Sequence, residues 1–139
     1  MFFIISGVSV TAYYENNPPS TPIITGPTTG KPDIEYDFTF ISTDPEGDDI
    51  YYVVNWGCCG NENHTYGPFL SGEEAKISHT WEKQGTFIIK AYAEDVYGAE
   101  GPEGTFSIKI PKNKTIQNSM LQLLQQRFQR LIIILQNIL

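Results

Sequence analysis

The fold follows from one short stretch, Ile34-Glu35-Tyr36-Asp37-Phe38-Thr39-Phe40. Apolar and aromatic residues alternate here with polar ones, so the two kinds fall on opposite sides of an extended chain. A helix would mix them around its circumference, because it repeats every ~3.6 residues rather than every two. The stretch therefore predicts a β-strand with one face buried in a core and the other face in water.

Runs of similar character lie on both sides of this stretch. Residues 22–25 form a short edge strand before it, and later runs lie at 50–56, 75–81, 86–94 and 105–110. Turn residues separate them, most clearly in Asp44-Pro45-Glu46-Gly47-Asp48. About six or seven short strands in about ninety residues predict an all-β fold, a β-sandwich of immunoglobulin type with about seven strands. A polar, Gly-rich segment at 57–67 reads as a loop within the series.

The chain has room for one domain and a little more. Its 139 residues, 40% of them hydrophobic, are enough to fill one compact core, because domains commonly hold ~100–150 residues. Composition divides the chain into four parts, which are an apolar segment 1–12, a linker 13–21, the β-sandwich 22–111 and a basic amphipathic tail 112–139.

The two segments before the sandwich differ in character. Residues 1–12 are apolar and small, and Val10-Thr11-Ala12 suits a signal peptidase, although no basic residue precedes the apolar run. This segment reads as a truncated signal peptide or as an apolar N-terminal strand. The linker and the residue after it contain three prolines, which favour extended chain. The sandwich is therefore expected to begin near Pro22.

Charge is divided unevenly between the sandwich and the tail. All sixteen acidic residues lie between Glu15 and Glu103, where four lysines oppose them and leave a net charge of −12. Residues 109–139 contain five basic residues and no acidic one. Because nucleic-acid binding depends on Lys and Arg neutralising phosphates, the acidic body excludes nucleic acid as a partner. The basic tail suits an anionic surface instead.

After Pro111 the hydrophobic period changes from two to about 3.5 residues. Apolar residues then recur at alternating steps of three and four, which predicts a C-terminal amphipathic α-helix that begins near Thr115. The apolar seam of this helix consists of Leu121, Leu124, Phe128, Leu131, Leu135 and Ile138.

Three occupants are compatible with this seam. A second copy or a protein partner suits the heptad spacing, and an anionic membrane surface suits the basic charge. The third is the sandwich of the same chain. A transmembrane span is disfavoured, because glutamines and two arginines interrupt the apolar run.

Three further segments carry a resemblance to a known family. They are YYVVNWG at 51–57, SHTWEKQGTF at 78–87 and AEDVYG at 93–98. In this order they resemble the PKD domain. The run from Asn17-Pro18-Pro19 to residues 110–114 is similar to PKD-like, immunoglobulin-like domains of archaeal and bacterial surface and secreted proteins. The resemblance covers residues 20–111 and implies an extracellular or cell-surface location.

The same resemblance implies a calcium site. Some PKD domains bind Ca²⁺ through residues of the acidic turn and through an Asp that ends a later strand. The ligands expected here are Asp44, Glu46, Asp48 and Asp95. Their carboxylate oxygens are the ligands that Ca²⁺ prefers. The alternative is a solvated turn in which Asp44 caps the backbone. No cofactor is required, and calcium is the one candidate.

Two adjacent cysteines mark a departure from the family. Where PKD domains carry Gly-Asp-Gly, this chain has Gly57-Cys58-Cys59-Gly60. A bond between neighbours encloses no useful loop and adds almost no chain-entropy stabilisation. Free thiols, a vicinal disulfide and bonds to another chain all stay open. Zinc bound by Cys58, Cys59 and His64 is disfavoured, because the usual Cys-x₂-Cys spacing is absent.

Catalysis is not expected from this sequence. It contains no nucleophile elbow, P-loop or zincin motif, and His79 shares a strand face with Ile77 and Trp81, as a packed residue would. A ligand such as polysaccharide is expected at Tyr66 and Phe69, within the segment 61–70, because binding residues gather on loops.

Sequons mark Asn63 and Asn113 as candidate glycosylation positions.

These observations favour a secreted or cell-surface structural or adhesive module that assembles, or is anchored, through its C-terminal helix. The alternative is an accessory carbohydrate- or protein-binding module of a secreted hydrolase system.

Overall fold

The computed structural model describes residues 15–58, 60, 62–112 and 119–138. The signal peptide or strand expected at 1–12 lies outside these residues. The elements are β1 (Ile23–Thr25), β2 (Glu35–Ile41), β3 (Ile50–Asn55), β4 (Asn63–Phe69), β5 (Ala75–Thr80), β6 (Gly85–Asp95), β7 (Gly104–Ile110) and α1 (Ser119–Gln136).

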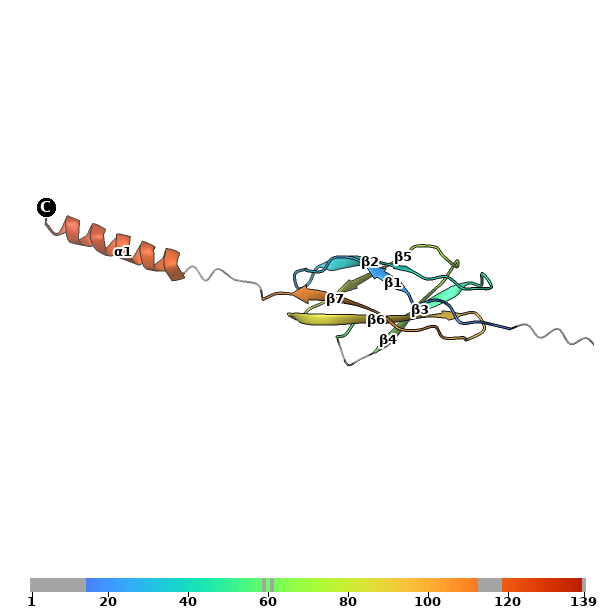
Figure 1. The fold of residues 1–139 in the computed structure, drawn as a ribbon. Coiled ribbons are helices and arrows are strands. Elements are labelled where there is room, and N and C mark those ends of the chain that lie inside the picture. The colour runs from blue at the N-terminus through green and yellow to red at the C-terminus, as the bar shows by residue number, and fades with distance from the viewer. Residues whose placement is uncertain (1–14, 59, 61, 113–118, 139) are drawn as a thin grey trace, which may run out of the picture.

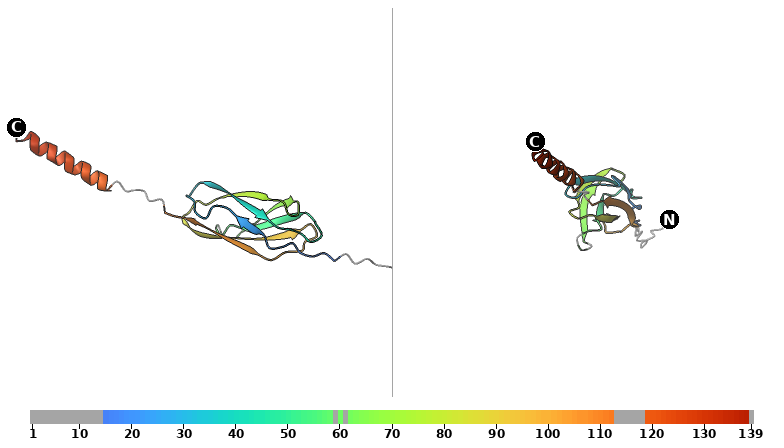
Figure 2. Two further views of the ribbon diagram at one scale, coloured as in Figure 1. Left: turned by 45° about the horizontal axis from the view of Figure 1, so that its top comes forward. Right: turned by 90° about the vertical axis from the view of Figure 1, so that its left-hand side faces the viewer.

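Two antiparallel sheets stack on one another, and α1 lies beyond one end of them (Figure 1). One sheet has the strand order β1-β2-β5, and the other has the order β4-β3-β6-β7. Figure 2 shows the same two layers from two further directions. Seven strands in two sheets, followed by a helix, confirm the predicted sandwich.

Aromatic rings from several strands fill the space between the sheets. Phe38 and Phe40 of the deciding stretch are fully buried, as the alternation predicts. The Phe38 ring centroid lies 5.7 Å from those of Trp56 and Trp81, which is the usual spacing of packed aromatic pairs. Ile34 differs from the prediction, because β2 begins one residue later and leaves this side chain 48% exposed.

The segment expected as a linker packs on the sandwich. Pro19 is fully buried, the Ser20 backbone N–H donates to the Thr43 carbonyl at 2.8 Å, and Ser42 Oγ donates to the Ser20 carbonyl at 2.6 Å. The prolines still account for its extended course. Residues 16–21 thus contribute to the body that was expected to begin at Pro22.

The segment expected as a loop at 57–67 contains most of β4. This strand pairs with β3 through Val54 with His64 and Tyr52 with Tyr66. Most of its side chains are exposed. Pro68 has no backbone N–H, so one hydrogen-bond donor is missing from the strand. A proline can be accommodated in β4 because β4 is an edge strand of its sheet. Apolar and polar residues alternate too weakly along β4 for the strand to be recognised in the sequence.

Replacing Phe38 by alanine is expected to lower the free energy of unfolding by about 3–5 kcal/mol, because it opens a cavity among the central rings. Ile88→Ala is the matched control, since Ile88 is 53% exposed and surface changes usually stay within about 0.5 kcal/mol. Urea unfolding measures both variants. Equal losses for the two would show that the centre of the core lies elsewhere.

Candidate functional site

The expected calcium ligands gather at one end of the sandwich. Asp44, Glu46 and Asp48 lie in the turn between β2 and β3, and Asp95 is the last residue of β6. The ends of β3 and β6 meet there, because Ile50 pairs with Asp95. A pocket at this end is lined by Asn16, Glu46, Asp48 and Tyr97.

Asp44 holds the turn together through its side chain. Its Oδ1 accepts the backbone N–H groups of Glu46 at 2.9 Å and Asp48 at 3.1 Å. This is the backbone-capping role considered for Asp44. Its Oδ2 is buried and has no hydrogen-bond partner. A buried carboxylate oxygen without a partner is costly, and a cation is one way to satisfy it.

Asp95 closes the turn that follows β6. Its Oδ1 accepts the backbone N–H groups of Tyr97 at 2.8 Å and Ala99 at 2.9 Å, and its Oδ2 accepts Asn16 Nδ2 at 2.7 Å. Burial opposes ionisation of this carboxyl, but these hydrogen bonds outweigh it and lower the pKa of Asp95. Asp95 is therefore ionised and structurally engaged.

Two asparagines donate hydrogen bonds to the carboxylates at this end, and the sequence alone does not identify them as part of the site. Besides the bond from Asn16 to Asp95, Asn17 donates to Glu46 through its backbone N–H at 3.2 Å and through Nδ2 at 2.7 Å. Their position before two prolines suggested only a linker. The signal that could have identified them is the amide group itself, which pairs well with carboxylates at the end of a sheet.

Asp48 shows that negative charge accumulates at this end. Partial burial raises the pKa of Asp48, and the charges of Asp44, Asp95, Glu46 and Asp49 raise it further. The two ion pairs in the described part of the chain, Lys76–Asp37 and Lys90–Glu103, involve none of these five carboxylates.

The chemistry of this end suits calcium, but its ligand geometry is incomplete. Carboxylates and an unpartnered oxygen are present, whereas no three His, Cys, Asp or Glu side chains within the described residues are placed to hold one ion. Binding would need the carboxylates to exchange hydrogen bonds for the metal. The calcium site stays a prediction.

Cys58 meets His79 at the opposite end of the sandwich. Cys58 Sγ lies 3.3 Å from His79 Nε2. The His79 ring stacks on Trp56 with a centroid distance of 4.5 Å and meets the edge of Trp81 at 4.6 Å. His79 is thus packed, as its strand face predicted. Cys59 lies outside the described residues, so the thiol, disulfide and zinc alternatives stay open.

Packing of His79 has an electrostatic consequence. Burial lowers the pKa of His79 to about 4, and the nearby His64 contributes to the lowering. The imidazole is therefore neutral at physiological pH.

Tyr66 and Phe69, expected to bind a ligand, face the core. Both are partly buried against it. Tyr66 Oη accepts a hydrogen bond from Trp56 Nε1 at 3.3 Å, and the Phe69 ring lies 5.7 Å from that of Tyr52. The ligand site at these two residues stays a prediction. Asn63 is exposed at the start of β4, and Asn113 lies outside the described residues.

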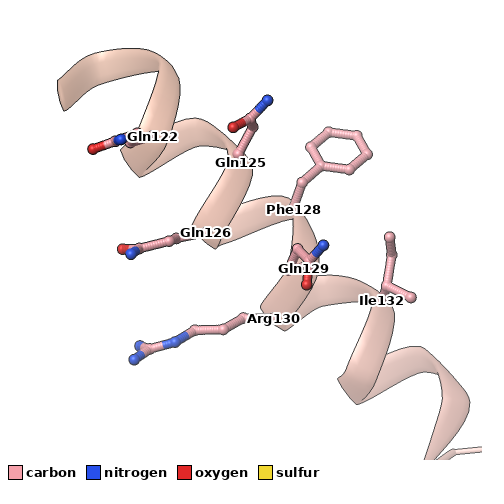
Figure 3. A pocket seen from close by; sticks show the side chains of 7 residues that line it. All are labelled: Gln122, Gln125, Gln126, Phe128, Gln129, Arg130 and Ile132. Carbon is pink, nitrogen blue, oxygen red and sulfur yellow. The ribbon is translucent and has the colours of Figure 1, made fainter. Parts of the chain in front are cut away.

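The apolar seam of α1 is exposed along its whole length. All six seam residues have exposed side chains, although Ile138 lies just after the last helical residue. Figure 3 shows Gln122, Gln126 and Arg130 projecting to one side of α1, while Phe128 and Ile132 project to the other. Polar and apolar side chains thus project to different sides in this part of α1, and its seam is not docked on the sandwich.

Two solved structures are similar to the chain. The PKD domain of an M14-like peptidase from a Thermoplasmatales archaeon has 42% sequence identity and a TM-score of 0.66, covering 70% of this chain and 100% of that one. The CARDB domain of a Pyrococcus furiosus protein, solved in complex with di-metal ions, has 14% identity and a TM-score of 0.43, covering 79% and 98%. No protein-family model and no curated protein matches the chain.

If calcium binds at the acidic end, Ca²⁺ added at about a hundredfold excess over its Kd should stabilise the fold by about 2.7 kcal/mol. Asp48→Asn should abolish this gain. It should not lower stability without calcium, because the raised pKa means that the charged form of Asp48 opposes folding. Glu82→Gln, at the opposite end, is the control. Thermal unfolding with and without Ca²⁺ tests this, and an unchanged midpoint in the wild type would refute the site.

Stability is expected to fall as the pH drops from about 6.5 to about 4. Across this range the histidine is protonated in the unfolded chain but stays neutral in the fold, because the pKa of His79 in the fold is about 4. Protonation therefore favours the unfolded state as the pH falls. His79→Gln should flatten the decline, whereas His64→Gln should change it much less. Urea midpoints measured across this range check the effect. An equal decline in His79→Gln would assign it to other groups.

Proposed function

The chain belongs to the PKD domain family, and on this basis we propose that its β-sandwich is a non-catalytic extracellular module attached through α1. The observation that carries the attachment is the exposed apolar seam of α1. Covering this seam with a partner would be favourable, because removing apolar surface from water contributes ~25 cal/mol per Å² of buried area.

The use of polar groups in the sandwich supports a non-catalytic role. Asp44 and Asp95 hold turns through backbone hydrogen bonds. His79 is stacked against Trp56 and kept neutral by burial. A general base needs an imidazole or carboxylate placed against a reacting group. These residues are instead engaged in the fold itself.

An extracellular location is supported by the kind of protein that the sandwich resembles. The similar domain is part of an M14-like peptidase. Within the described residues, no helix is long and apolar enough to cross a membrane.

A second candidate function follows from the same comparison. Because the similar PKD domain belongs to a peptidase, this module could serve a secreted hydrolase by binding carbohydrate or protein. The candidate ligand residues Tyr66 and Phe69 are partly buried against the core, so a ligand could contact only the parts of them that stay exposed. Retention of the intact chain on insoluble polysaccharide would favour this second function.

The attachment is tested by exporting the full chain from a bacterial host and measuring its distribution between envelope and soluble fractions, and its mass by light scattering. We expect the wild type to be retained on the envelope or to form oligomers. Leu124→Ser/Leu131→Ser should be a soluble monomer, because it breaks the seam. Gln122→Ser/Gln129→Ser adds the same residues on the polar face and should behave as the wild type. A wild type that is itself a soluble monomer would refute the attachment.

A further inference from the structure

We propose that α1 binds the surface of an anionic lipid bilayer, with residues 131–135 inserted among the acyl chains. This proposal rests on the attachment proposed above and identifies the partner of the seam. It follows from two features of α1, which are the distribution of apolar residues around its last turns and the sign of its charge.

Five consecutive residues just before the last residue of the helix place apolar side chains on every side of it. Residues 131–135 are Leu, Ile, Ile, Ile and Leu, and successive residues of a helix are rotated by about 100°. Five consecutive residues therefore surround the helix completely. All five side chains are exposed, with fractions between 48% for Ile132 and 58% for Leu131. Whatever covers this end must surround it.

A second copy of the helix could cover only one side of this end. The heptad seam runs through Leu124 and Leu131, and Ile133 lies roughly opposite to it on the helix. Ile133 follows Gln126 by seven residues and Gln129 by four, so it lies on the face that is polar in the preceding turns. A two-stranded coiled coil would leave Ile133 in water, whereas a bilayer buries it together with the seam.

The middle turns of α1 have the pattern of an interfacial helix. There the apolar side chains Phe128 and Ile132 project away from Gln122, Gln126 and Arg130 (Figure 3). A helix with one polar face lies in the plane of the interface with its apolar face turned toward the acyl chains. The polar face of these turns is thus replaced by apolar residues at 131–135, before Gln136 ends the helix, which suits a segment that lies at the surface and enters the acyl region at that stretch.

Charge favours an anionic surface over a neutral one. The described helix carries Arg127 and Arg130 and no acidic residue, and Lys109 and Lys112 precede it. Each basic residue near an anionic membrane strengthens binding about fivefold. A second copy would bring the same positive charges together without any opposing acid. Charge complementarity therefore points to lipid headgroups.

The geometry also favours surface binding over a span. The 18 residues of α1 extend about 27 Å at 1.5 Å per residue, less than the ~30 Å hydrocarbon core of a bilayer. Four glutamines and both arginines lie between residues 122 and 130, and Gln136 is the last residue of the helix. Only residues 131–135 form an uninterrupted apolar run that can enter the membrane.

The test uses the full chain with vesicles of phosphatidylcholine and with vesicles that also contain phosphatidylglycerol. We expect binding to the anionic vesicles in co-sedimentation, and much weaker binding to the neutral ones. Arg127→Gln/Arg130→Gln should weaken binding on the order of 30-fold. Ile133→Ser should weaken it roughly tenfold or more, because burying one isoleucine is equivalent to at least that factor. Gln126→Ser, on the same face, is the matched control and should bind as the wild type.

Light scattering in buffer separates the possible failures. One outcome is a chain that binds no vesicles but forms an oligomer, which Leu124→Ser dissociates and Ile133→Ser leaves intact. That outcome would refute the lipid partner and would support attachment through α1. Equal binding to neutral vesicles, or unchanged binding of Ile133→Ser, also refutes the proposal. A monomer that binds no vesicle and is not retained on the envelope refutes both the lipid partner and the attachment.

Discussion

The packing of Phe38 against two tryptophans is the contact on which the rest of the sandwich depends. Phe38 comes from β2 in one sheet, and Trp56 follows β3 in the other, so their contact sets how the sheets face each other. Trp81 joins them and donates from Nε1 to the Trp56 carbonyl at 3.3 Å. This bond fixes the chain where it leaves β3, and it thereby places Cys58 beside His79.

The strands could be predicted from the sequence where one face of the strand is buried and the other is in water. Phe38 and Phe40 alternate with polar residues, and the period of two identifies both the strand and its buried face. The sequence does not reveal β4, because its side chains are mostly exposed and only Tyr66 and Phe69 reach the core. The sequence around Pro19 was interpreted as a linker, since proline indicates extended chain but not whether that chain packs on a surface.

The candidate sites could be predicted less well, because they depend on contacts between distant residues. The acidic turn is visible as a cluster in the sequence, but the bond from Asn16 to Asp95 joins residues 79 positions apart. Likewise Cys58 follows β3 of one sheet and His79 lies in β5 of the other, and only the folded chain brings Cys58 Sγ to 3.3 Å from His79 Nε2. The helix seam was easier, because its residues are neighbours in sequence and its exposure needs no partner to be recognised.

The two ends of the sandwich also determine how it would carry force. The blue start of the described chain and the orange end of β7 lie at opposite ends of the sandwich (Figure 1). Near its exit β7 forms a parallel bridge, Thr29 with Lys109, in which the Gly30 N–H bonds the Lys109 carbonyl and the Lys109 N–H bonds the Thr28 carbonyl. Tension between the two ends would shear these two bonds together instead of opening them one after the other. A module held at α1 and pulled from its other end would therefore resist stretching along its length.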